Sequence, residues 1–263
     1  MVYKRFARLF HLASSPEASA RVRAAQRLGR MGKRAAIPEA IGVALRLLED
    51  RDRDVRIAAA CAVGKVGEVS EEVLGAMVRL LGDKDPYVRI EAALALGKLG
   101  EAAARPEVLS ALAAALRDEA PGVGAAAAGA LEGMGRRAAT REVLEALARA
   151  VCYSWSELVR WKAIRAIGEM GEAAAVDGIL YALAYVIEKA NKESVYAARV
   201  LWRIAVQAGG EFLERARGVL EQAAREAEAE VARAILAGER PYYYGELLCK
   251  FIRETLGGGG YGS

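Results

Sequence analysis

Apolar and polar positions recur along this chain with a spacing of 33 to 36 residues. Each copy carries small residues at its fifth and sixth positions, then an aliphatic ninth residue and usually a glycine at the tenth. This spacing of apolar side chains predicts an amphipathic helix in every copy. The clearest copies start at Val55 (VRIAAACAVGKVG), Val88 (VRIEAALALGKLG) and Val159 (VRWKAIRAIGEMG), and weaker ones start at Ala20, Val123 and Glu193.

A second helix is expected after each copy, because another pattern follows in register. An acid marks its first turn, where a carboxylate complements the helix dipole, and apolar or small residues recur 2, 5, 6 and 9 positions later. These acids are Glu39, Glu72, Glu107, Glu142, Asp177 and Glu211. Each copy therefore predicts a helix hairpin that can bury its apolar face only against neighbouring hairpins.

Paired glycines, such as Gly64 with Gly67 and Gly97 with Gly100, follow the aliphatic residue of most copies. We expect both glycines of a pair at the end of the first helix, where glycine tolerates a positive φ. The last copy has Trp202 and Ala205 instead, as expected of an atypical terminal repeat.

The shared pattern D-x-x-V-R-x-x-A-A-x-A-L-G-x-x-G resembles the HEAT-like repeats of the phycobilisome-lyase type, over roughly residues 15–230. This resemblance implies an all-α fold, a right-handed α-solenoid of about six HEAT-like hairpins with a C-terminal helix. It also implies that the second helices line the concave surface. The fold hosts many unrelated functions, so the resemblance favours a binding scaffold without naming the partner.

The repeat boundaries divide the chain into four kinds of segment. Residues 1–14 form a basic N-terminal segment, residues 231–256 form C-terminal capping helices, and the Gly-rich residues 257–263 have the composition of a flexible tail. The hairpins between them are expected at about 15–50, 51–83, 84–118, 119–154, 155–188 and 189–230.

Charge is concentrated at one end of the chain. Residues 1–34 hold nine Lys and Arg residues against Glu17 alone, so this segment carries +8, whereas the whole chain has a formal net charge of +4. Such a block predicts a docking surface for nucleic acid or an acidic protein, although a solvated solenoid cap explains it equally well. We name as the basic end Lys4, Arg5, Arg8, Arg23, Arg27, Arg30, Lys33 and Arg34.

Four further arginines stand at the start of first helices: Arg21, Arg56, Arg89 and Arg160. Because acidic turns lie close to them, we expect each guanidinium to pair with a turn carboxylate and to hold the repeats in register. The alternative interpretation is that the four arginines form a row of anion-binding sites.

The second helices share a row of arginines on the face opposite their core stripe. Arg46, Arg79 and Arg149 occupy one position, seven residues after the first-turn acid, and small residues such as Gly42 and Gly75 stand one turn before. This second-helix row is either a partner-binding groove or an ordinary solvated face.

The fifth repeat departs from that pattern, because apolar residues replace the polar ones. We name as the apolar patch Leu180, Tyr181, Ala184, Tyr185 and Ile187. An apolar face of this kind needs a cover. We expect the cover to be the C-terminal helix, about Tyr243 to Leu256, and a partner protein or a second copy of the chain is the alternative.

Catalytic and metal chemistry have few candidates in this sequence. His11 is the only histidine and the three cysteines are widely spaced, which disfavours a metal centre, a cofactor or a disulfide framework. The di-iron chemistry of HEAT-repeat deoxyhypusine hydroxylases is thereby excluded. An enzyme resembling solenoid DNA glycosylases stays as a third hypothesis, with Trp155, Trp161, Trp202 and Glu157 in the functional roles.

Composition also predicts the setting of the protein. The chain lacks an apolar stretch long enough for a membrane span, so a cytoplasmic protein is expected, and the shortage of Asn and Gln suggests a thermophilic source. The sequence as a whole predicts a non-enzymatic scaffold that binds a protein partner. Direct binding of nucleic acid or ribonucleoprotein is the alternative.

Overall fold

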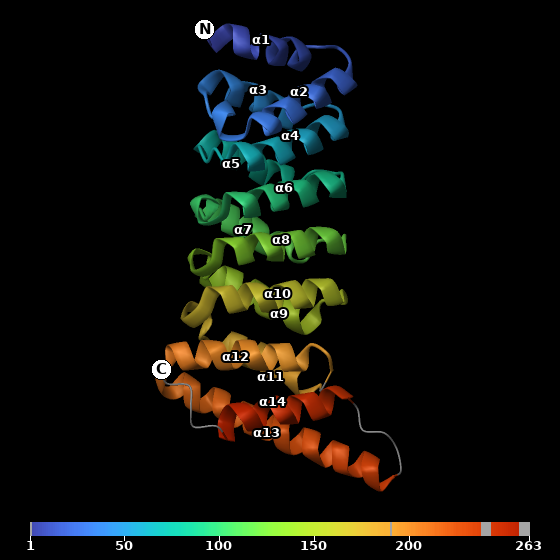
Figure 1. Cartoon of the computed structure of the whole chain (residues 1–263), viewed down its shortest axis with the longest axis vertical. Coiled ribbons are helices and arrows are strands. Elements are labelled where there is room, and N and C mark those ends of the chain that lie inside the picture. Colours follow the sequence, from blue (N-terminus) through green and yellow to red (C-terminus); the bar gives the residue numbers. More distant parts are fainter. Residues whose placement is uncertain (1, 190, 238–242, 258–263) are drawn as a thin grey trace. The chain divides into compact units, whose positions relative to one another are not determined.

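The computed structural model describes residues 2–189, 191–237 and 243–257, and Figure 1 shows their arrangement. These residues form α-helices joined by short turns, without a strand in the described ranges. The predicted all-α solenoid class is therefore confirmed. The first helices of the hairpins are α2 (Ala18–Met31), α4 (Arg53–Val66), α6 (Pro86–Leu99), α8 (Pro121–Met134), α10 (Glu157–Met170) and α12 (Ser194–Ala208).

The second helices begin at or beside the predicted first-turn acids. They are α3 (Pro38–Leu48), α5 (Glu71–Leu80), α7 (Pro106–Ala115), α9 (Arg141–Tyr153), α11 (Asp177–Glu188) and α13 (Gly210–Leu236). Helix α1 (Val2–Ala13) precedes the first hairpin and α14 (Tyr243–Gly257) follows the last. Four 3-10 turns follow first helices: η1 (Gly32–Ala35), η2 (Gly100–Ala103), η3 (Gly135–Ala138) and η4 (Gly171–Ala174). The expected tail lies outside the described residues from residue 258 onward.

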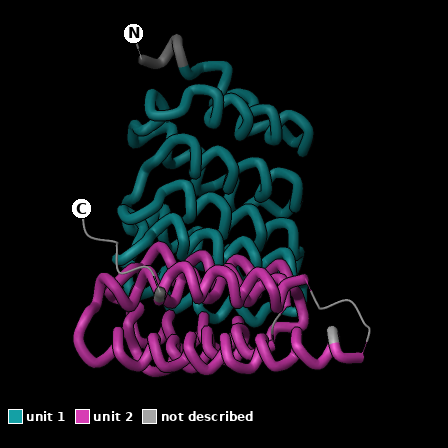
Figure 2. The backbone as a smooth tube through the Cα atoms, turned by 60° about the horizontal axis from the view of Figure 1, so that its bottom comes forward, with its two compact units in different colours: residues 1–138 teal, residues 139–263 magenta. Residues whose placement is uncertain are grey.

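The chain divides into two compact units, residues 1–138 and residues 139–263 (Figure 2). Unit 1 holds α1 to α8, and its first helices α2, α4, α6 and α8 pack successively against one another. Unit 2 holds α9 to α14. Each unit has a core of Ala, Val and Leu side chains from both helices of its hairpins, to which unit 2 adds Ile.

The paired glycines serve two different purposes. The second glycine of a pair caps the helix with a positive φ, as at Gly67 (φ 78°) and Gly100 (φ 59°). The first lies inside the helix, so the expectation that both stand at the helix end is wrong. A Cβ on Gly97 would lie 3.0 Å from the Cα of Ala130, and one on Gly64 would lie 3.0 Å from the Cα of Ala95. These glycines let adjacent first helices approach backbone to backbone.

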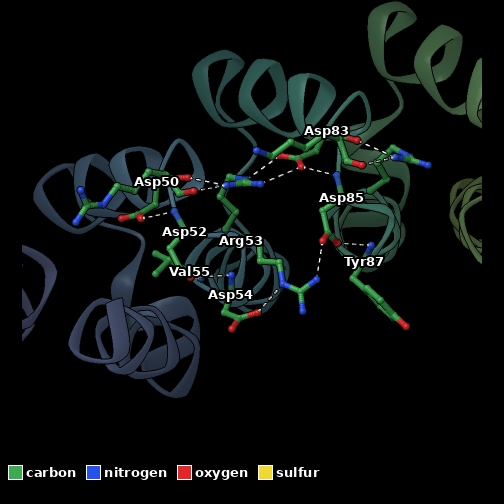
Figure 3. A network of polar contacts seen from close by, with 12 residues as sticks. Asp50, Asp52, Arg53, Asp54, Val55, Asp83, Asp85 and Tyr87 are labelled. Atoms are coloured by element: carbon green, nitrogen blue, oxygen red, sulfur yellow. Dashed lines mark hydrogen bonds and ion pairs between the residues drawn. The ribbon is translucent and has the colours of Figure 1, made fainter. Parts of the chain in front are cut away.

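The four first-helix arginines tie neighbouring turns together, as expected. In the second repeat, Arg56 donates to both carboxylate oxygens of Asp83, at 2.7 and 3.0 Å. The same guanidinium donates to the backbone carbonyls of Asp50 and Arg51 in the turn before its helix. Figure 3 shows this network around Asp50 and Asp83. Corresponding bonds join Arg21 to Asp50, Arg89 to Asp118 and Arg160 to Glu193.

The acid in each pair belongs to the turn that follows the hairpin, whereas the turn before it supplies only carbonyls. Asp83 also accepts the backbone N–H of Asp85 at 2.9 Å. Burial alone would raise the pKa of Asp83, but the bonds from Arg56 and the Asp85 N–H outweigh it, so its pKa lies below the ordinary value. The carboxylate is therefore held ionised as part of the fold.

In unit 2, the apolar patch is mostly covered by neighbouring helices. Leu180, Ala184 and Ile187 are buried, because α11 packs against α9, α12 and α13. Tyr181 and Tyr185 remain exposed.

The expected cover, α14, packs instead on α13 and α12, where Leu248 and Ile252 are buried. The prediction that α14 covers the apolar patch is wrong. A partner protein or a second copy of the chain would meet only the two tyrosines of this patch.

Candidate interaction surfaces

Five residues of the basic end have exposed side chains on α1, α2 and η1. Arg8, Arg23, Arg30, Lys33 and Arg34 are all exposed, and none has an acid within ion-pair distance among the described residues. Arg21, by contrast, is 8% exposed and bound to Asp50. The structure thus separates arginines that hold the fold from arginines that face solvent.

Three other residues of this end differ from those five. Arg27 is half-buried, and its Nε is buried without a hydrogen-bond acceptor in the described structure. The side chains of Lys4 and Arg5 lie outside the described residues.

The second-helix row is divided between the two units. Arg46 and Arg79 belong to unit 1, and Arg149 belongs to unit 2. Arg79 pairs with Glu49 at 2.7 Å, with both side chains 64% exposed, and Arg149 lies 4.0 Å from Glu145. A hollow of about 450 Å³ does lie near Gly75, but Arg105 supplies its guanidinium rather than Arg79.

A second hollow lies on the exposed side of the first helices in unit 1. We name it the first-helix groove: about 590 Å³ over α4, bordered by α2 and by Glu91 of α6. Val22, Ile57, Ala58 and Cys61 form its apolar floor, and all four are half-buried.

Sequence reasoning missed this groove because it treated each first helix as a core element. The signal in the sequence was the apolar third residue of the repeat, which is only half-buried in the structure: Val22, Ile57 and Ile90.

In unit 2, exposed aromatic side chains gather at the start of α10. Trp155 is 78% exposed and Tyr153 is 81% exposed. The ring of Trp161 lies 6.3 Å from that of Tyr196, with the Arg165 guanidinium 4.8 Å from its centroid. Cation–π contacts of this kind stabilise an exposed indole.

Of the residues named for a glycosylase-like enzyme, Glu157 and Trp161 have structural partners here, whereas Trp155 is exposed. Glu157 pairs with Lys192 at 2.5 Å, while Trp161 lies against Tyr196 and Trp202 is half-buried. Among the described residues, no group of three or more His, Cys, Asp and Glu side chains is placed to hold a metal ion. Nor is any helix there both long and apolar enough to cross a membrane.

The repeated hairpins and their stacked first helices define an α-solenoid repeat protein. Models of HEAT repeats match residues 6–76, 45–132 and 77–153, and a PBS lyase HEAT-like repeat matches residues 159–185. These matches cover more than half of the sequence, so the chain belongs to the HEAT-repeat family, as the sequence pattern predicted.

Solved structures that align with this chain include engineered proteins and a designed armadillo repeat protein. An engineered protein from the Northeast Structural Genomics Consortium aligns with a TM-score of 0.60 and 20% identity, over 96% of this chain and 68% of its own. Another from the same consortium aligns with a TM-score of 0.50 and 21% identity, over 83% and 96%. A designed armadillo repeat protein in complex with the peptide (KR)4 aligns with a TM-score of 0.48 and 19% identity, over 81% and 97%. No curated protein matches the sequence.

Proposed function

We propose that this HEAT-repeat chain is a non-enzymatic scaffold that binds an acidic protein partner through its basic end. The observation that supports the proposal best is the separation of the arginines. The four repeat arginines are bound to turn carboxylates, whereas the exposed cations of the basic end have no acidic partner in the described structure. Unpaired cations of one sign attract an acidic surface and accelerate its association.

Affinity capture from an extract of the source organism, treated with nuclease, tests this proposal. The wild-type chain is expected to retain a stoichiometric protein that a charge-reversed variant, Arg8→Glu with Arg23→Glu and Arg34→Glu, does not retain. A matched variant reverses three exposed cations elsewhere, Lys84→Glu with Arg117→Glu and Arg217→Glu, and is expected to retain it. Equal capture by both variants, or no stoichiometric protein on the wild-type chain, overturns the proposal.

Binding of nucleic acid or ribonucleoprotein is a second candidate function, favoured by the density of arginine on α2. The exposed guanidinium groups of Arg23 and Arg30 on α2 provide donors for hydrogen bonds to phosphate oxygens. This function predicts retardation of DNA or RNA at low salt and a steep loss of affinity as salt rises. Replacing Arg23, Arg27 and Arg30 by alanine is expected to make the plot of log affinity against log salt concentration less steep. The slope falls by about 0.7–0.9 for each phosphate that is no longer neutralised. Retardation that does not respond to salt contradicts it.

A further inference from the structure

Two cations that line the first-helix groove, Arg30 and Lys65, occupy the same position of the repeat. Arg30, Lys65 and Lys98 each stand in the last turn of their first helix, on α2, α4 and α6. The aliphatic stem of Lys65 packs over Gly29, where its Cδ lies 3.4 Å from the position that a Cβ would occupy. The stem of Lys98 packs over Gly64 in the same way, at 3.3 Å. Each lysine stem therefore lies against the glycine that directly precedes the cation of the preceding repeat.

This run of like charges is specific to unit 1. In unit 2 the same position holds Glu169 on α10, and it pairs with Arg203 of α12 at 3.5 Å. Opposite charges at this position therefore neutralise each other in unit 2. Arg30 and Lys65 have no carboxylate within ion-pair distance in the described part of unit 1, and Lys98 lies 3.7 Å from Glu91. A cation at this repeat position is not required to stabilise the helix dipole, because α8 has Gly133 and α10 has Glu169 at the same position.

The floor and the far side of the groove narrow the choice of ligand. Val22, Ile57 and Cys61 offer an apolar surface between the cations and the carboxylates of Asp54 and Glu91. The Oε1 of Glu91 is buried and accepts no hydrogen bond in the described structure. A nucleic-acid backbone would place phosphates against these carboxylates and leave the apolar floor unused. A peptide segment has apolar side chains for the floor.

We infer that the first-helix groove binds an amphipathic segment of the partner protein, with apolar side chains on the floor and carboxylates against Arg30 and Lys65. This inference rests on the proposed function and extends it from the basic end to α4. Arg30 belongs to both the basic end and the first-helix groove. An acidic partner bound at the basic end can therefore extend a segment into the groove.

Thiol protection on the full chain tests the inference, because Cys61 lies in the groove floor. The probe is a short labelled peptide with leucines on one helical face and glutamates on the other. It is expected to slow alkylation of Cys61, measured by mass spectrometry, without changing the rate at Cys152, which lies on α9 in unit 2. The same peptide with lysine in place of glutamate is expected to leave both rates unchanged.

A charge-reversal pair supplies the second measurement. Arg30→Glu with Lys65→Glu is expected to weaken binding of the acidic peptide about tenfold or more, and Lys84→Glu with Arg117→Glu, two exposed turn cations, is expected to leave it unchanged. Equal weakening by both pairs overturns the inference, as does protection of Cys61 by single-stranded DNA that exceeds protection by the peptide. Absence of peptide binding overturns it as well. If the peptide binds without protecting Cys61, the groove inference fails while binding at the basic end stands.

Discussion

Single arginines decide how the hairpins of this protein are joined. Arg89 is 8% exposed and holds both oxygens of Asp118 at 2.8 Å, while one of its nitrogens donates to the carbonyls of Asp83 and Lys84. A planar guanidinium meets this demand because it presents several donors in a fixed geometry. Lysine cannot replace it with the same number of bonds.

Replacing Arg89 by methionine is therefore expected to lower the free energy of unfolding by about 2–4 kcal/mol, since Asp118 would stay partly buried without its partner. Urea denaturation measures the loss. Arg141→Ala is the matched control, because Arg141 forms an ion pair with Glu145 on the exposed surface, where such pairs contribute little. Similar effects of the two substitutions would contradict the structural role of Arg89.

Acid is expected to weaken the same network. The pKa of Asp50 is lowered, since the bonds from Arg21 and the Asp52 N–H outweigh the effect of burial, and Asp83 behaves alike. A carboxylate with a lowered folded-state pKa stabilises the fold above its unfolded pKa of about 3.9 and loses that contribution as pH falls further. The fold is thus expected to weaken progressively below about pH 4. Asp83→Asn should lose less stability than wild type between about pH 5 and pH 2.5, measured by urea midpoints. If the urea midpoints of Asp83→Asn and wild type fall in parallel as the pH is lowered, the role given to the Asp83 carboxylate is refuted.

At the scale of helices, glycine sets the distance between first helices. Gly97 has the Cα of Ala130 directly against it, and backbone contact of this kind leaves no space for a methyl group. Gly42 on α3 has nothing within 4 Å of the equivalent point. Both glycines lie inside helices, yet only one of them is required by packing.

Gly97→Ala is expected to destabilise the protein by about 1–3 kcal/mol, because the added Cβ must push α8 away. Gly42→Ala is expected to stabilise it by about 0.5–1 kcal/mol through helix propensity alone. Thermal unfolding of the two variants, side by side with wild type, checks both. A stabilised Gly97→Ala would show that α6 and α8 do not pack as closely as described.

The sequence predicted the hairpins because period and first-turn acids are local signals. It predicted the arginine pairs for the same reason, since four of the six copies have arginine as their second residue and acidic turns lie close by in the sequence. It did not predict what covers Leu180 and Ile187, because their neighbours α9, α12 and α13 meet α11 only in the tertiary fold. The first-helix groove was missed on similar grounds, since its residues come from three different repeats.

At the scale of the whole molecule, charge distinguishes one end of the repeat series from the rest. Residues 1–34 carry nine cations and one acid, and the cations continue along the groove edge to Lys65. The remaining exposed arginines and lysines more often stand beside an acid, as Arg137 does beside Glu101 at 3.2 Å. We therefore propose that the first repeats bind the partner and that the other repeats support the structure.

Zero-length carbodiimide cross-linking of the captured complex tests this assignment most directly, because the reagent joins lysine amines to carboxylates that touch them. We expect cross-links from Lys33 and Lys65 to acidic residues of the partner. Lys84, Lys189 and Lys250 are also exposed and are expected to form none. Cross-links confined to those three lysines would contradict the assignment of partner binding to the first repeats.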